Sequence, residues 1–312
     1  MDLPSEPALR WILTQCAHLR AAHAPAFADG ALIEPTAAFF PDDFRGDAAS
    51  VDRLARRMIS YAPISEEVPI QIVFGAADDD GAGDCGGNGC GVDACGGSAQ
   101  AGRAADSIEP AGDGYRWRLE VAHLGHPHLL TAALARGVGQ LVRLEGEQGG
   151  AAPEAELTGV MCGFGVLLLN GAEVWGKSCG GLRRTQVTSL RASELAIALA
   201  LFLAVHGHPA SACRSHLETA QREALGGAID WAASNEHLVG MLRDQPALLE
   251  TGLFELEPVR GPLARWLHRR EAGRVAAQAP VPSSATRPAR SEDQRRRFEE
   301  ARSLVDEVLG PK

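Results

Sequence analysis

Aromatic residues make up only 5% of this 312-residue chain. Glycine, by contrast, occurs 35 times, and 45% of the residues are hydrophobic. This content is enough for one large hydrophobic core or two modest ones, and it predicts packing dominated by small side chains.

The chain also has too few basic residues for a nucleic-acid partner to be the first expectation. Its formal net charge is −10, whereas a phosphate backbone selects basic surfaces. The charge turns positive only from Arg260 onward. We therefore expect no nucleic-acid partner.

No apolar run is long enough to predict a membrane span. The segments 160–169 and 195–205 are each about 10–12 residues, and a bilayer requires about 20. The chain does not begin with a basic stretch followed by an apolar run, so we expect no signal peptide and no membrane partner. An odd cysteine count, 7, fits a reducing compartment better than a disulfide framework, so we predict a cytoplasmic protein.

The motifs of P-loop nucleotide binders and serine hydrolases, G-x-x-x-x-G-K-[ST] and G-x-S-x-G, do not occur.

Alternation of apolar and polar residues predicts paired strands at 68–74 and 115–122, with a long loop at 75–113 between them. Residues 32–44 are expected to form an extended entry strand followed by a turn. Apolar residues at helical spacing predict helices at 7–23, 51–61 (capped by Ser50), 127–145, 154–170, 193–205 (capped by Ser193), 211–225, 236–243 and 291–309.

The segments PHLLTAALARGVGQLVRL and ELTGVMCGFGVLLLN carry a resemblance. Together with the upstream FFPDDF and the later SELAIALALF, they are similar to a bacterial family of zincin-like metallopeptidases. That family has a Pro-started helix with an H-E-x-x-H motif, an acidic loop, and a second helix opened by E-L-T-D. The likeness covers about residues 32–242.

The resemblance implies that the catalytic positions of the family have been lost here. Arg136, Gly137 and Gln140 stand where the family has its two histidines and its general base, and none of the three can replace them at a zinc ion. On the second helix Glu156 remains, but Gly159 occupies the aspartate position. We expect an ion pair between Arg136 and Glu156 in place of a metal.

Two expectations follow for this vestigial site. The helices at 127–145 and 154–170 should pack side by side, with Arg136, Gln140 and Glu156 turned toward one another. Restoring the motif through Arg136→His, Gly137→Glu, Gln140→His and Gly159→Asp should then create zinc binding.

Two other groups are candidate metal ligands. His123, His126 and His128 form an H-x-x-H-x-H pattern that is compatible with zinc. Cys85, Cys90 and Cys95 lie at five-residue spacing on the glycine-rich loop, where thiolates can hold zinc or an iron–sulfur cluster. Solvent-exposed histidines and free or reversibly paired thiols are the alternatives.

The predicted fold is α+β: a mainly helical zincin-like core with a small N-terminal sheet and a tethered C-terminal helix. The expected parts are residues 1–126, 127–258 and the basic linker and helix at 259–312. The amphipathic helix at 291–309 is a candidate for docking onto a protein partner. We predict a non-catalytic interaction or scaffold protein with no resident cofactor. The alternative is a metal-dependent hydrolase, or a metal or redox binder.

Overall fold

Residues 1–260 and 261–312 form two separate units in the computed structural model. All the elements given below belong to the first unit. The cysteine positions 85, 90 and 95 and the expected helix at 291–309 lie outside the described residues. The structure describes residues 3–23, 27, 30–65, 67–75, 106–178 and 181–261.

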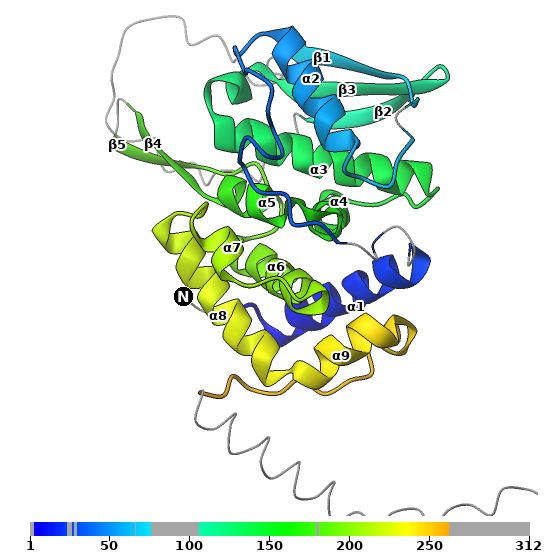
Figure 1. Ribbon diagram of the computed structural model, residues 1–312, viewed down its shortest axis with the longest axis vertical. Coiled ribbons are helices and arrows are strands. Elements are labelled where there is room, and N and C mark those ends of the chain that lie inside the picture. The colour runs from blue at the N-terminus through cyan, green and yellow to red at the C-terminus, as the bar shows by residue number, and fades with distance from the viewer. Residues whose placement is uncertain are drawn as a thin grey trace, which may run out of the picture. The chain divides into compact units, whose positions relative to one another are not determined.

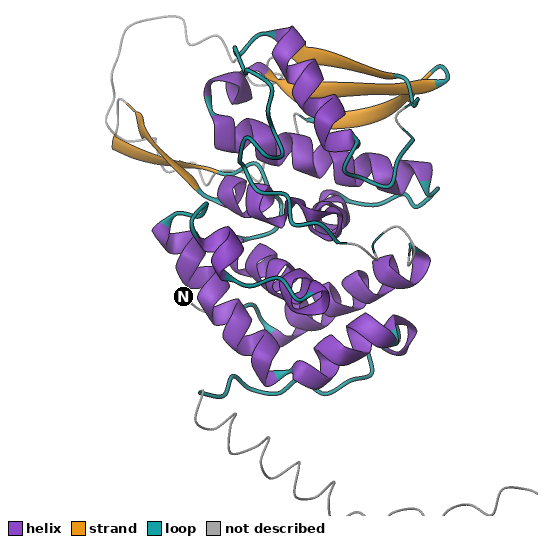
Figure 2. Ribbon diagram, in the orientation of Figure 1, coloured by secondary structure: helices purple, strands orange, loops and turns teal. Residues whose placement is uncertain are grey.

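The described part is mostly helical, with a small sheet in its N-terminal half, which confirms the α+β prediction (Figures 1 and 2). The strands are β1 (Ile70–Gly75), β2 (Ser107–Ala111), β3 (Gly114–Glu120), β4 (Val174–Ser178) and β5 (Gly181–Thr185). The helices are α1 (Glu6–Ala22), α2 (Ala48–Ile59), η1 (Val121–Gly125), α3 (Pro127–Glu145), α4 (Ala152–Gly159), η2 (Val160–Phe164), α5 (Gly165–Ala172), α6 (Ala192–His206), α7 (Ser211–Arg214), α8 (Thr219–Ser234), α9 (Glu236–Asp244) and η3 (Pro246–Leu248).

The three-stranded sheet has the order β1-β3-β2. The predicted pairing of the two alternating segments is confirmed, because β1 pairs with β3 in parallel register. The loop prediction for 75–113 is wrong at its end, where β2 forms an antiparallel edge strand against β3. Pro110 lies within β2, and proline is tolerated there because an edge strand leaves some amides unpaired.

Two predicted helix caps are wrong. Asp47, not Ser50, caps α2: its Oδ1 accepts the Ser50 amide at 2.7 Å, and Ser50 Oγ accepts the Asp47 amide at 3.1 Å. This reciprocal capping box places Ser50 inside the first turn. Helix α6 begins at Ala192 with Arg191 as its cap residue, so Ser193 also lies inside the helix.

Several other predicted elements differ from the structure. The helix expected at 211–225 is divided into α7 and α8, and the hairpin β4–β5 was not predicted at all. Residues 32–44 form no strand. The predictions for α1 and α9 are confirmed to within one residue at each end.

The helix predicted at 154–170 is a composite of α4, η2 and α5. A wide turn interrupts it at Gly163, whose φ is 94°. A Cβ at Gly163 would lie 2.0 Å from the Ala31 carbonyl oxygen, and the Ile33 amide donates to the Gly163 carbonyl at 3.1 Å. The crossing chain at 31–33 therefore requires glycine here. The whole segment, Ala152–Ala172, is long and apolar enough to span a membrane, but its apolar window is entirely buried within the protein.

Helix α3 lies between the sheet and the α4–α5 segment, and α6 lies beyond that segment (Figure 1). Both sides of α3 are covered, so its residues are buried almost without interruption from Leu129 to Val142. Leu130, Leu134, Val138 and Leu141 are buried as predicted. One hydrophobic cluster runs across the expected boundary at 126/127 and includes both Trp117 and Leu134.

Candidate functional site

Helices α3 and α4 lie side by side, which confirms that part of the prediction. Their backbones approach so closely that a Cβ at Gly139 would lie 2.0 Å from the Ala155 carbonyl oxygen. A Cβ at Gly159 would lie 2.9 Å from the Ala135 carbonyl oxygen. Gly159, one of the positions of the expected vestigial site, is thus a contact point between two helices.

Gly137 has a second packing role, on the side of α3 that faces the sheet. A Cβ at this position would lie 2.1 Å from a ring carbon of Trp117. The Trp117 side chain belongs to β3 and is only 1% exposed. The indole therefore occupies the space that the side chain of a general base would need.

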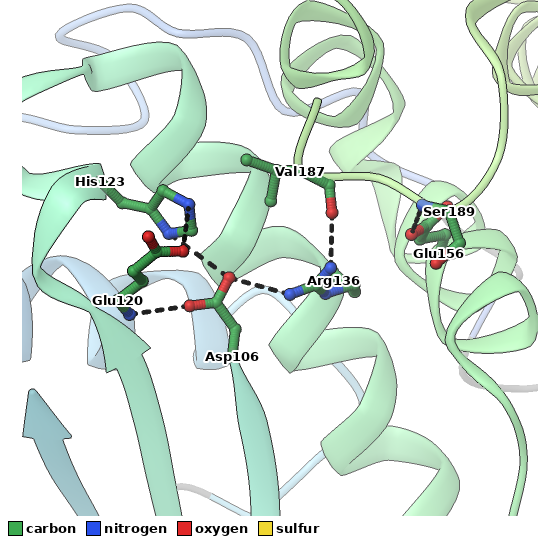
Figure 3. Close-up of polar contacts among 7 residues, drawn as sticks. All are labelled: Asp106, Glu120, His123, Arg136, Glu156, Val187 and Ser189. Carbon is green, nitrogen blue, oxygen red and sulfur yellow. Dashed lines mark hydrogen bonds and ion pairs between the residues drawn. The ribbon is translucent and has the colours of Figure 1, made fainter. Parts of the chain in front are cut away.

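The Arg136 guanidinium is buried and bonds to two other parts of the chain. Its Nη2 donates to Asp106 Oδ2 at 2.9 Å, and its Nη1 donates to the Val187 carbonyl (Figure 3). The two charged side chains are 8% and 5% exposed. The expected ion pair with Glu156 is wrong: the partner of Arg136 is Asp106, which precedes β2.

Asp106 joins three parts of the chain. Besides Arg136, its Oδ1 accepts the Glu120 amide at 2.8 Å, and His123 Nδ1 lies 3.4 Å from its Oδ2. Burial by itself raises the pKa of Asp106, but the neighbouring His123, Arg136 and Glu120 amide together hold that pKa below its usual value. Asp106 is therefore an ionised carboxylate in the core.

The three predicted metal-binding histidines are not equivalent. His123 is buried, its Nε2 lies 3.5 Å from Glu120 Oε2, and its Nδ1 has no well-formed hydrogen bond. His126 and His128 are exposed. Among the residues that the structure describes, no three His, Cys, Asp or Glu side chains converge as a metal-ligand set. His123, His126 and His128 therefore do not form such a set.

Glu156 faces the segment that precedes α6. Its carboxylate accepts the Ser189 amide at 2.6 Å and the Leu190 amide at 2.8 Å, and the residue is 0% exposed. Burial raises the pKa of Glu156 to about 7, against the opposing effect of these amides and of the Arg136 charge.

The expected convergence of three side chains is therefore wrong. Gln140 donates to the Ile108 carbonyl of β2 at 3.3 Å, and Arg136 also bonds toward Asp106. Glu156 bonds instead to the 189–190 backbone. Arg136 and Gln140 join α3 to the region of β2, and Arg136 also joins α3 to Val187. Glu156 joins α4 to residues 189–190 of the same segment before α6.

Two of the four substitutions that would rebuild the motif meet closely packed atoms in this arrangement. Gly137→Glu would meet the Trp117 ring, and Gly159→Asp would meet the α3 backbone. A zinc ion at the Arg136 position would also leave Asp106 without its guanidinium.

Sequence reasoning missed Asp106, Glu120 and the Val187 carbonyl. Asp106 lies 30 positions before Arg136, at the end of a glycine- and alanine-rich stretch. No periodicity marks it. The only local signal was an acidic residue directly before an alternating segment.

Comparisons with protein-family models, with curated proteins and with solved structures return no match for this chain.

Proposed function

We propose that this protein is a non-catalytic, cytoplasmic interaction or scaffold module built on a zincin-like helical core. The main support for the proposal is the burial and hydrogen bonding of Arg136. At the first ligand position of the resembling motif there is a buried guanidinium that already bonds to Asp106 and to the Val187 carbonyl. An arginine stays protonated and cannot coordinate zinc.

The neighbouring groups support the same reading. Gly137 has no side chain and no room for one beside Trp117. Both carboxylate oxygens of Glu156 accept backbone amides. Gly137 therefore supplies no base for a zinc-bound water, which hydrolysis by this class of site requires, and the Glu156 carboxylate is held by backbone amides.

The hairpin β4–β5 is the candidate contact surface. It extends beside the helices (Figure 1), and Trp175 on β4 is 55% exposed. Exposed tryptophans are frequent energetic anchors of protein interfaces. The amphipathic segment at 291–309, expected from the sequence alone, is a second candidate surface.

Metal analysis and a peptidase assay test the non-catalytic part of the proposal. We expect purified full-length protein to contain no stoichiometric zinc between α3 and α4 and to cleave no peptide in a broad panel. Hydrolysis that a chelator stops and that Glu156→Ala abolishes would refute the proposal. Activity that survives Glu156→Ala but is lost with His123→Ala would support the metal-dependent alternative.

Cross-linking in the native cells tests the contact surface. Trp175→Ser should weaken capture of a partner by about tenfold or more, as is typical for loss of an interfacial tryptophan. Leu248→Ser is the matched control, because Leu248 is 53% exposed but lies in η3. Equal capture by both variants and the wild type would exclude the hairpin.

A further inference from the structure

Three arginines of α2 border a surface pocket of about 370 Å³ that is separate from the Arg136 network. Arg56 and Arg57 follow Arg53 by three and four positions, so both lie on the same face of the helix as Arg53. The opposite face, with Val51, Ala55 and Met58, is buried. The amphipathic character of α2 therefore directs the guanidinium groups into the pocket.

The binding capacity of the three guanidiniums is only partly used. Arg57 Nη2 lies 3.2 Å from Asp42 Oδ2, and Arg56 Nε lies 2.8 Å from Asp52 Oδ2. All four side chains are 40% exposed or more, so solvent screens both pairs. Within the described part of the chain, Arg53 forms no ion pair. Among the described residues, the pocket thus has one guanidinium, that of Arg53, outside any ion pair, and two whose acidic partners are exchangeable.

The remaining wall is apolar. Ile59, the last residue of α2, and Ile70, the first residue of β1, line the pocket together with Ser60 and Val68, which precedes the strand. The volume lies in the range of small-molecule sites, about 300–1,000 Å³. A free phosphate ion would leave most of this space and the apolar wall unused.

We propose that this pocket binds a small organic phosphate monoester. Guanidinium groups bind phosphate oxygens through paired, directional hydrogen bonds. A dianion also competes with the Asp42 carboxylate for Arg57 better than a monoanion does. The pocket lies at the C-terminal end of α2, where the helix dipole disfavours anions, so the arginines supply the binding.

Calorimetry with phenyl phosphate as the probe and the full-length protein tests this site. Phenyl phosphate should bind about tenfold or more tightly than inorganic phosphate or phenol, because only it uses both the arginines and the apolar wall. Arg53→Gln and Arg57→Gln should each weaken its binding about tenfold. Asp42→Asn, which removes the competing carboxylate, should tighten binding by about two- to fivefold.

Arg222→Gln is the matched control, because Arg222 is an exposed helical arginine on α8. It should leave the affinity for phenyl phosphate unchanged, and circular dichroism should show that every variant is folded. Three results would each overturn the proposal: binding no tighter than that of phenol, equal loss in Arg222→Gln and Arg53→Gln, or a preference for single-stranded oligonucleotide over phenyl phosphate.

Discussion

At the scale of single residues, two buried carboxylates have opposite effects on stability. The pKa of Asp106 is held low, so its contribution is present at neutral pH and is lost as the pH falls through the folded-state pKa. The pKa of Glu156 is raised to about 7. Its folded form therefore binds a proton that the unfolded form has released, and stability decreases as the pH rises from the unfolded-state value toward 7.

The Glu156 effect is measurable by urea unfolding at several pH values. Between pH 5 and pH 8 the free energy of unfolding should fall by up to roughly 3 kcal/mol through this group. Glu156→Gln, which cannot ionise, should show a much flatter dependence over the same range. Parallel curves for the two proteins would show that Glu156 is not the titrating group.

The Arg136–Asp106 pair calls for a double-mutant cycle. Arg136→Met should destabilise the protein by about 3–5 kcal/mol, because it leaves the Asp106 carboxylate buried without its guanidinium. Asp106→Asn in the Arg136→Met background should recover part of this loss, and denaturant midpoints provide the measurement. Strictly additive single-variant effects would contradict a coupled pair.

At the scale of elements, a glycine of α3 or α4 can be interpreted in two ways: as the remnant of a lost site or as a packing contact. An interior glycine costs about 1 kcal/mol relative to alanine in an isolated helix, so from the sequence Gly137 looked like a defect of a decayed site. In the fold it is the position where the Trp117 ring contacts α3. The local cost is offset by packing that only the sheet makes possible.

Two alanine variants distinguish these interpretations. Gly137→Ala should destabilise the protein by about 1–3 kcal/mol, since its Cβ would overlap a buried indole. Gly227→Ala in α8 is the control: nothing lies within 4 Å of its Cβ position, so it should stabilise by up to about 1 kcal/mol. Thermal unfolding measures both. A stabilised Gly137→Ala variant would show that the ring moves away freely.

At the scale of the whole molecule, the hydrophobic cluster joins segments from Leu9 to Leu249. It includes α1, the sheet and the helical region that the sequence assigned to separate parts. Ile12 and Leu13 of α1 are 0% exposed, and Trp117 of β3 is 1% exposed. The region 127–258 therefore shares its core with α1 and the sheet.

Shortened proteins test this organisation. A protein ending at Arg260 should unfold cooperatively at the same urea midpoint as the full chain, because every cluster member among the described residues precedes Arg260. A protein of residues 127–258 should not unfold cooperatively, since it lacks α1 and the sheet. Cooperative unfolding of 127–258 at the full-length midpoint would contradict a single shared core.

The sequence by itself determined the features that depend on near neighbours. Apolar spacing located α1, α3 and α9, and alternation located β1 and β3, because those patterns report which face of an element is buried. It also singled out Arg136 and Glu156 as positions of the expected vestigial site. The sequence could not supply their partners.

Only the tertiary structure decided what those charges bond to. Arg136 bonds across 30 and 51 positions of sequence, to Asp106 and to the Val187 carbonyl. Glu156 bonds across 33 positions to the Ser189 amide. The requirement for glycine at positions 137, 139 and 163 likewise comes from distant chain segments. Periodicity within one helix contains no information about such contacts, because it shows which face is buried but not which distant residue contacts that face.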